Sequence, residues 1–306
     1  MNKTVQKRAK KKNAFVICML IWPLLQFAVF YVYMNFNNIM LAFKGMRENG
    51  STYWAGLSNF KEALTGVDSE ILLISLKNNI IMFFIMWFIG MPLNILFGYY
   101  LYKKKPGYSV IRVIYMLPGM ISGIVVSMLF MKFVEEALPV AYLSLTGKIL
   151  PNLLRNNNTA FAMQIVYSLW LGFSTSIIIY SNAMNSIDPE IFEAGRIDGT
   201  NNLTEIVLIL IPMMMPTLST YIITGFAGIL TGSGSLFVFY GLNDVPKNTY
   251  FLGYYLFKIA MTGDLTAYPR AAAVSVLMTI VTVPVTLLVR WILDRIDPMR
   301  DNYKVD

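Results

Sequence analysis

The residue types present in the chain exclude most covalent chemistry. The 306 residues include no histidine, which excludes HExxH zinc sites, histidine-assisted nucleophiles and histidine proton relays. No GxxxxGK[ST] sequence is present, so we do not expect the chain itself to hydrolyse ATP. The Gly- and Ser-rich segment 231–235 lacks the lysine that would complete a phosphate-binding loop. We therefore expect no catalytic residues, no metal site and no cofactor in this chain.

Composition places most of the chain in a membrane. Hydrophobic residues make up 56% of the sequence, charged residues make up only 14%, and the mean hydropathy is +0.56. The single cysteine, Cys18, cannot form an internal disulfide. The net charge of +8 arises from Lys and Arg residues around apolar runs, which is typical of membrane orientation and argues against a nucleic-acid partner.

Apolar runs predict an all-α membrane protein with six transmembrane helices. Spans are expected near residues 14–34, 78–102, 110–133, 159–182, 206–230 and 270–293. Lysines 103–105 follow an aromatic cluster, which marks a cytoplasmic exit, and both basic termini are expected on the same side. Pro118-Gly119 is expected to bend the third span, and Pro212 with Pro216 the fifth.

These spans suggest a simple division of the chain. The expected parts are a basic cytoplasmic N-terminus (1–13), a first transmembrane helix (14–34), an external loop (35–75), a five-helix core (76–296) and a cytoplasmic tail (297–306). The core includes one substantial cytoplasmic connection, residues 183–205, which we call the polar hairpin.

Capping residues predict two short helices in the polar hairpin. Asp188 can cap a helix that Pro189 opens, and Gly199 lets the chain turn out of that helix. A second helix is expected to begin near Asn202, which has capping-box spacing to Glu205. The polar hairpin therefore reads as a helix, a tight turn and a helix.

Two apolar residues of the polar hairpin suggest that it binds a partner. Ile191 and Phe192 are expected to be exposed, because they lie in a polar connection between membrane spans. An exposed apolar knob of this kind is typical of a docking surface.

This stretch resembles the EAA loop of permease subunits from bacterial ABC importers. The match comprises Glu193-Ala194-Gly195, then Gly199, then Ile209 and Ile211-Pro212 at the family's spacing. The usual form has a second Ala at position 195 and Leu at position 211, so both departures keep a small or aliphatic residue. A weaker resemblance, to a segment after the first span of sugar-type permeases, is carried by Gly56-Leu57 and Asn59-Phe60.

The resemblance implies the type I ABC importer permease fold and a coupling helix that docks in an ATPase subunit. Glu193 would contact the ATPase, and Gly199 would form the turn. The residues expected to dock or couple are Pro189, Ile191, Phe192, Glu193, Ala194, Gly195, Asp198, Gly199, Ile209 and Pro212. The implied partners are a second homologous permease, two ATPase subunits that bind ATP and Mg, an extracellular solute-binding protein and the lipid bilayer of the bacterial plasma membrane.

A carbohydrate substrate is expected from similarity to permeases of oligosaccharide and polysaccharide-fragment importers. Sugar passage by alternating access calls for aromatic faces and neutral hydrogen-bonding groups. Candidate path residues, for each of which helix packing is an equal alternative, are Tyr115, Tyr167, Trp170, Ser174 and Thr224. Two other functions stay open: an ABC permease for a non-sugar solute, and an ATP-independent channel or membrane assembly factor.

Overall fold

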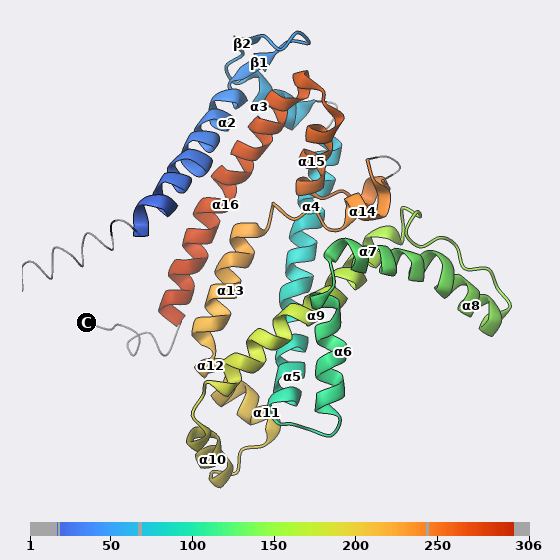
Figure 1. Cartoon of the computed structure of the whole chain (residues 1–306), viewed down its shortest axis with the longest axis vertical. Coiled ribbons are helices and arrows are strands. Elements are labelled where there is room, and N and C mark those ends of the chain that lie inside the picture. The colour runs from blue at the N-terminus through green and yellow to red at the C-terminus, as the bar shows by residue number, and fades with distance from the viewer. Residues whose placement is uncertain (1–16, 18, 67–68, 243–244, 297–306) are drawn as a thin grey trace, which may run out of the picture. The chain divides into compact units, whose positions relative to one another are not determined.

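The computed structural model describes residues 17, 19–66, 69–242 and 245–296 (Figure 1). Its contacts divide the chain into two compact units. The first comprises residues up to Val67 with Gly263–Leu277, and the second comprises Asp68–Thr262 with the chain from Met278 onward. The predicted N-terminal segment 1–13, Cys18 and the predicted tail 297–306 lie outside the described residues.

A long N-terminal helix opens the first unit. Its π-helical part η1 (Phe27–Tyr33) and its α-helical part α2 (Met34–Ala42) belong to one apolar helix, Met19–Ala42. The helix therefore continues eight residues beyond the predicted end of the span at residue 34, and the position of the membrane boundary along it stays a prediction. The asparagines after residue 34 do not end the helix, because apolar residues follow them and Ala42 packs in a buried cluster with Ala272 and Ala273.

A small β-hairpin and a short helix follow in the first unit. Strand β1 (Lys44–Met46) pairs antiparallel with β2 (Thr52–Trp54), and helix α3 spans Ser58–Thr65. The buried Asn59 side chain donates hydrogen bonds of 2.8 Å to the carbonyls of both Ala42 and Lys44. Asn59, which the sequence singled out by resemblance, thus fastens α3 to the end of the preceding helix. The first unit also contains η6 (Leu265–Ala267) and the beginning of α16 (Tyr268–Ile296).

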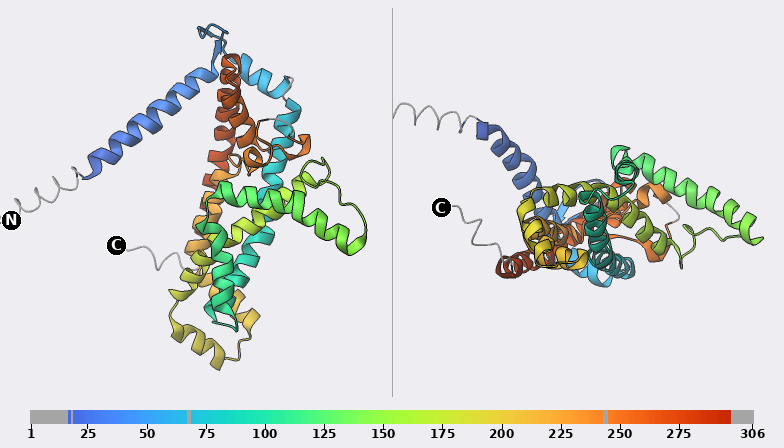
Figure 2. Two further views of the ribbon diagram at one scale, coloured as in Figure 1. Left: turned by 45° about the vertical axis from the view of Figure 1, so that its right-hand side comes forward. Right: turned by 90° about the horizontal axis from the view of Figure 1, so that it is seen from below.

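The second unit contains the remaining helices (Figures 1 and 2). A continuous helix, Ser69–Tyr102, comprises α4 (Ser69–Ile85), η2 (Met86–Gly90) and α5 (Met91–Tyr102). Next come α6 (Tyr108–Met120), α7 (Gly123–Lys132), η3 (Phe133–Ala137), α8 (Leu138–Thr146) and α9 (Ala160–Asn185). They are followed by α10 (Pro189–Ile197), α11 (Asn202–Thr204), η4 (Glu205–Leu210), α12 (Ile211–Met213) and α13 (Met215–Gly228). The last short elements are α14 (Leu236–Tyr240), η5 (Lys247–Thr249) and α15 (Leu252–Thr262).

The helices confirm the predicted all-α membrane fold. Within the described residues, four helices are long and apolar enough to cross a membrane, and two bent pairs raise the number to six if each pair is one span. The four are Met19–Ala42, Ser69–Tyr102, Ala160–Asn185 and Leu265–Ile296. Because this assignment uses length and composition alone, the cytoplasmic placement of both termini stays a prediction.

The predicted third span, residues 110–133, does not run straight. Helix α6 ends at Met120, Ile121 is extended, and α7 begins at Gly123, so that the two parts meet at 107°. The bend lies beyond Pro118, which is inside α6, and not at the predicted Pro-Gly step. The helical path then continues to Thr146, with the π-helical part η3 directly before Pro139, where a changed hydrogen-bond register accommodates a proline inside a helix.

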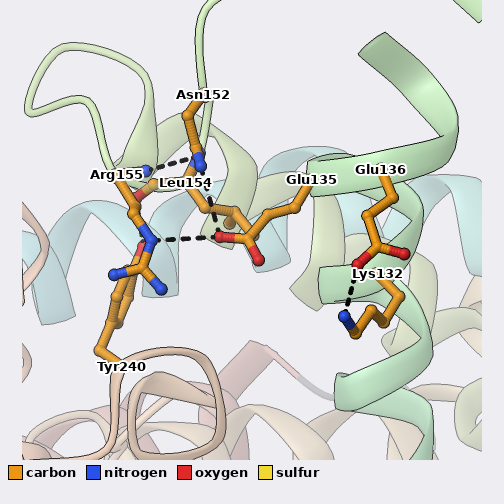
Figure 3. A network of polar contacts seen from close by, with 7 residues as sticks. All are labelled: Lys132, Glu135, Glu136, Asn152, Leu154, Arg155 and Tyr240. Carbon is orange, nitrogen blue, oxygen red and sulfur yellow. Dashed lines mark hydrogen bonds and ion pairs between the residues drawn. The ribbon is translucent and has the colours of Figure 1, made fainter. Parts of the chain in front are cut away.

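A polar network holds the connection between α8 and α9 (Figure 3). Glu135 accepts from Arg155 Nε at 3.3 Å and from Asn152 Nδ2 at 3.4 Å. The side-chain oxygen of Asn152 accepts from the backbone N–H groups of Leu154 and Arg155, and Tyr240 donates to the Leu154 carbonyl at 2.7 Å. Burial raises the pKa of the Tyr240 hydroxyl above its usual value. The network fixes a loop that would otherwise leave backbone groups unpaired.

Candidate functional site

The polar hairpin forms a capped helix and a tight turn, as predicted. The Asp188 carboxylate accepts from the Glu190 N–H at 3.0 Å, and Pro189 occupies the first turn of α10. Gly199 has a φ of +83°, and its N–H donates to the Arg196 carbonyl at 3.1 Å. A side chain at position 199 would strain this left-handed backbone, so glycine is the residue that permits the turn.

The predicted exposure of two apolar residues in the hairpin is confirmed for Ile191 and wrong for Phe192. Phe192 is 2% exposed, whereas Ile191 is 37% exposed and Ile197 is 87% exposed. The prediction for Phe192 is wrong because α10 lies against α5, and the Phe192 ring packs on Tyr102 with a centroid distance of 5.4 Å. Helical spacing puts Phe192 and Gly195 on the inner face, so a projection at 100° per residue would have separated Phe192 from Ile191.

The exposed face of α10 is acidic. Asp188, Glu190, Glu193 and Asp198 are all exposed on or beside α10, and Arg196 is the one exposed base among residues 188–198. Four carboxylates against one guanidinium give this surface a negative potential within a chain of net charge +8. A partner surface that complements it would be basic around an apolar centre.

Two parts of the EAA-like motif touch each other in the folded hairpin. A Cβ atom added to the buried Gly195 would lie 2.7 Å from Ile209 Cδ1 and 3.2 Å from Thr200 Oγ1. The space that a second alanine would fill is therefore occupied by the Ile209 side chain. This contact gives a packing reason for Gly195 in this chain.

The second helix of the polar hairpin is capped one residue earlier than predicted. Asn201, not Asn202, is the N-cap, and its side-chain oxygen accepts from the Thr204 N–H at 2.9 Å. Glu205 therefore plays no part in a capping box. Its buried carboxylate instead forms an ion pair with Lys103 Nζ.

Lys103 lies in an aromatic cage between α5 and the polar hairpin. Its ammonium group is 5.2 Å from the ring centroid of Tyr99, 5.7 Å from that of Tyr102 and 5.4 Å from that of Phe192. The Lys103 and Glu205 side chains are 12% and 4% exposed. Desolvated cation–π contacts are stronger than exposed ones, and separating a buried ion pair leaves uncompensated charges, so this cluster holds the hairpin against α5. In the sequence, Lys103 showed only that a span ends here, because no local pattern links it to Glu205.

The apolar side of the hairpin continues into the membrane-spanning helices. One buried cluster joins α5, α9, α10 and the broken span of η4 to α13, and its members are Ile95, Tyr99, Tyr180, Met184, Ile187, Phe192, Ile206, Leu210, Met214 and Leu218. The span breaks at Met214, where its two parts meet at 71°. Pro212 lies before the break and Pro216 just after it, as the prediction of a bent fifth span requires.

Three adjoining cavities lie in the second unit, and residues of the helix Ser69–Tyr102 line two of them. Their volumes are about 320, 330 and 380 Å³. The first shares Trp87 and Gly225 with the second, and it shares Ser168 and Gly234 with the third, so the three adjoin through common walls. No charged side chain is among the residues that line them.

The predicted path residues are only partly placed at these cavities. Thr224 lines the second cavity and Tyr167 lines the third, although the Tyr167 hydroxyl is also 2.7 Å from Ser127 Oγ. The other three line none of the three cavities. Tyr115 packs on Phe97 and Phe173, Trp170 stacks on Phe130, and the buried Ser174 donates to the Leu171 carbonyl. Their predicted role in the path stays untested.

Two polar residues that line the cavities were not identified from the sequence. Gln164 is 1% exposed and lines the third cavity, yet neither of its amide atoms has a hydrogen-bond partner among the described residues. Asn94 lines the second cavity, and its side-chain oxygen is likewise buried and unpaired within the described chain. A polar residue in an apolar helix was the available signal, because such residues usually face the protein interior or a cavity.

Together these features define a membrane protein of several spans with an exposed, capped helix and a set of adjoining cavities without charged lining residues. The described residues contain no group of three or more His, Cys, Asp or Glu that could hold a metal ion. Residues 75–301 match the family described as "Binding-protein-dependent transport system inner membrane component", and the chain belongs to that family. It is therefore a multi-pass inner-membrane subunit of a transport system.

Two curated relatives match most of the chain. The multiple sugar-binding transport system permease protein MsmF of Streptococcus mutans is 26% identical over 259 residues, which is 83% of this chain and 87% of that protein. The arabinooligosaccharides transport system permease protein AraP of Bacillus subtilis is 23% identical over 271 residues, covering 86% and 83% of the two chains.

Solved structures show the same fold at low identity. A chain of a bacterial ABC transporter involved in the import of the acidic polysaccharide alginate superposes with a TM-score of 0.81 at 18% identity, covering 95% of this chain and 99% of the other. A second structure, in complex with an alginate pentasaccharide-bound periplasmic protein, gives a TM-score of 0.79 at 17% identity, covering 95% and 98%. These likenesses confirm the permease fold.

Proposed function

We propose that this chain is the transmembrane permease subunit of an ATP-driven ABC importer that moves an oligosaccharide into the cytoplasm by alternating access. The observation that carries the proposal is the hairpin geometry: α10 turns Ile191, Ile197 and four carboxylates outward, while Phe192 and Lys103 anchor it from behind. A connection that only joined two spans would need neither this surface nor this anchor.

The acidic face of α10 supports docking to an ATPase subunit. The ATPase subunit would provide a groove with basic side chains around an apolar floor. Glu193 would lie at the rim of this groove and Ile191 inside it. Two such subunits would bind ATP and Mg, and their closure would pull the polar hairpin. A second related permease would complete the path, and a solute-binding protein would deliver the substrate from outside. This chain would convert movement into access without covalent chemistry.

The uncharged cavities support a neutral substrate. A solute with carboxylates would need opposite charges to replace its water shell, and none lines the three cavities. Trp87, Tyr167 and Tyr221 offer aromatic faces, while Gln164 and Asn94 offer unpaired amides to sugar hydroxyls. We therefore favour a neutral oligosaccharide over an acidic one, and the relatives whose names refer to sugars support this class.

Affinity purification from native membranes in mild detergent, followed by mass spectrometry, tests this function. We expect a second permease, an ATPase and an extracellular binding protein to accompany the chain. The binding protein can then be screened against neutral and acidic oligosaccharides, with uptake measured for those that bind. Recovery of the chain without any ATPase in several detergents would favour a channel or an assembly factor instead. Preference for a charged or non-sugar solute would contradict only the substrate assignment.

A further inference from the structure

One helix reaches from the polar hairpin to the cavities. The helix Ser69–Tyr102 is continuous through its π-helical part η2, and Lys103 follows it directly. Its residues contribute to the walls of two cavities through Asn79, Met86 and Asn94. At 1.5 Å per residue, Asn79 and Lys103 are about 36 Å apart along this helix. A rigid element of this length can carry a movement from one end to the other.

At its inner end, this helix holds a part of the chain that is distant in sequence. The polar hairpin is covalently joined only to α9 and to the span that begins with η4. Its attachment to α5 combines the buried apolar cluster with polar contacts: the Lys103–Glu205 ion pair, the cage around Lys103, and a hydrogen bond of 3.2 Å from Tyr99 to Asn202. Removing one member of a buried pair leaves the other charge uncompensated, so this attachment is sensitive to a single substitution.

Toward its other end, the helix holds the Gly- and Ser-rich segment 231–235. Asn79 donates to the carbonyls of Ile229 at 2.9 Å and Gly232 at 3.4 Å, and it accepts from the Leu252 N–H at 2.9 Å. Both Gly232 and Gly234 belong to cavity walls. Asn79 therefore joins the beginning of segment 231–235 to the beginning of α15, a role that the segment's composition did not reveal.

We propose that Lys103 and Glu205 are positioning residues that tie the polar hairpin to the helix Ser69–Tyr102, and that Asn79 passes the movement of this helix to segment 231–235. The link rests on the proposed function, because an ATPase must move the hairpin. When it does, α5 moves with α10, and the cavity wall at segment 231–235 shifts. The ion pair thus connects the docking surface to the solute path through the helix Ser69–Tyr102. This helix is not a direct neighbour of the hairpin in the sequence.

The test follows segment 231–235 directly in the purified transporter complex in liposomes. Ser233 is exposed and is replaced by cysteine in a background in which Cys18 is changed to Ser. The rate of labelling with fluorescein maleimide is measured with and without ATP and vanadate. We expect ATP to change the rate by about fivefold or more in this parent, and Lys103→Gln to abolish the change.

Matched variants separate positioning from folding. Lys104→Gln neutralises the next, exposed lysine and should keep the full response. The double exchange Lys103→Glu with Glu205→Lys restores the pair in reverse and should recover most of the response. Asn79→Ala should lose the response while ATPase co-purification stays at the parent level. Membrane amount and ATPase recovery are measured for every variant.

Three outcomes would overturn the proposed link or the proposed function on which it rests. An unchanged ATP response in Lys103→Gln, with the ATPase bound, overturns the proposed link. A parent complex that contains the ATPase but shows no response at Ser233→Cys overturns it as well. Absence of an ATPase from the parent complex contradicts the proposed function itself, and that result is recognised before any variant is compared.

Discussion

The polar hairpin and the three cavities use polar residues in opposite ways. In the hairpin, charges are abundant: the acids of α10 point outward, and Lys103 with Glu205 is paired inside. Along the cavities, charge is absent from the described lining, and the amides of Gln164 and Asn94 are left partly or wholly unpaired. Under the proposed function, the contrast separates a surface that would hold a protein partner from a path that must release its solute.

Placing a charge in the cavities should have the largest effect, because it removes the difference between the cavities and the charged hairpin. Thr224→Lys puts an ammonium group beside Asn94 in the second cavity. Burying an unpaired charge within a membrane costs about 3 kcal/mol, so we expect uptake to fall by about 100-fold. Uptake of the substrate by intact cells measures the effect. Thr224→Val, which changes the same cavity position without adding a charge, is the control and should retain most uptake. Equal activity of both variants would show that the cavities are not the path.

Reversing a charge on the hairpin should have the next largest effect. Glu193→Lys opposes the basic groove that we propose for the ATPase, and a like-charge contact across an interface should lower ATPase recovery about tenfold or more. The measurement is co-purification at low and high salt, because screening should reduce the defect. Lys105→Glu, at an exposed position outside the polar hairpin, serves as the charge-reversal control. Normal ATPase recovery with Glu193→Lys would remove Glu193 from the docking surface.

Filling the space at Gly195 should cause a smaller change. Gly195→Ala brings a methyl group to 2.7 Å from Ile209 Cδ1, the end of a flexible side chain. Overpacking of this kind costs about 1–3 kcal/mol, which a lower thermal unfolding temperature of the purified chain would report. Adding Ile209→Val removes the Cδ1 atom and should recover most of the loss. An unfolding temperature that the second substitution does not raise would mean that the two residues do not compete for space.

The helix cap gives the smallest expected effect. Asp188→Ala removes the acceptor for the Glu190 N–H and should destabilise α10 by about 1 kcal/mol. Hydrogen exchange over residues 189–197 should become faster, whereas exchange in α9 should stay unchanged. Asp188→Asn keeps an acceptor and should preserve protection. Equal exchange in all three proteins would indicate that neighbouring contacts alone hold the helix.

Local signals predicted the hairpin well, and distant contacts could not be predicted. Asp188, Pro189 and Gly199 act on backbone groups a few residues away, so their types and spacing were sufficient. The Lys103–Glu205 pair joins residues 102 positions apart (205 − 103), and only the folded chain brings them together. The error at Phe192 has the same origin, because its burial depends on where α5 lies.

Span existence was also predictable, while span shape was not. Apolar length located the helices and bent pairs that could cross a membrane among the described residues, yet Ile121 and Ser122 break one helix and Met214 another through local backbone changes. A hydropathy value is an average over many residues, so it does not reveal a break at one or two positions. The cavities follow from these bends and from the neighbours of Gln164, so their lining could not be deduced from residue types alone.

Photo-crosslinking from the exposed face of α10 tests directly whether this helix docks in an ATPase subunit. Benzoylphenylalanine is incorporated at Ala194, which is exposed between Ile191 and Ile197, and at Val281 on α16 as a control. After illumination of intact membranes, crosslinked products are purified and identified by mass spectrometry. We expect an ATP-binding cassette ATPase to be attached through position 194 and not through position 281. Crosslinks from position 194 to lipid alone, or to proteins that bind no nucleotide, would contradict it.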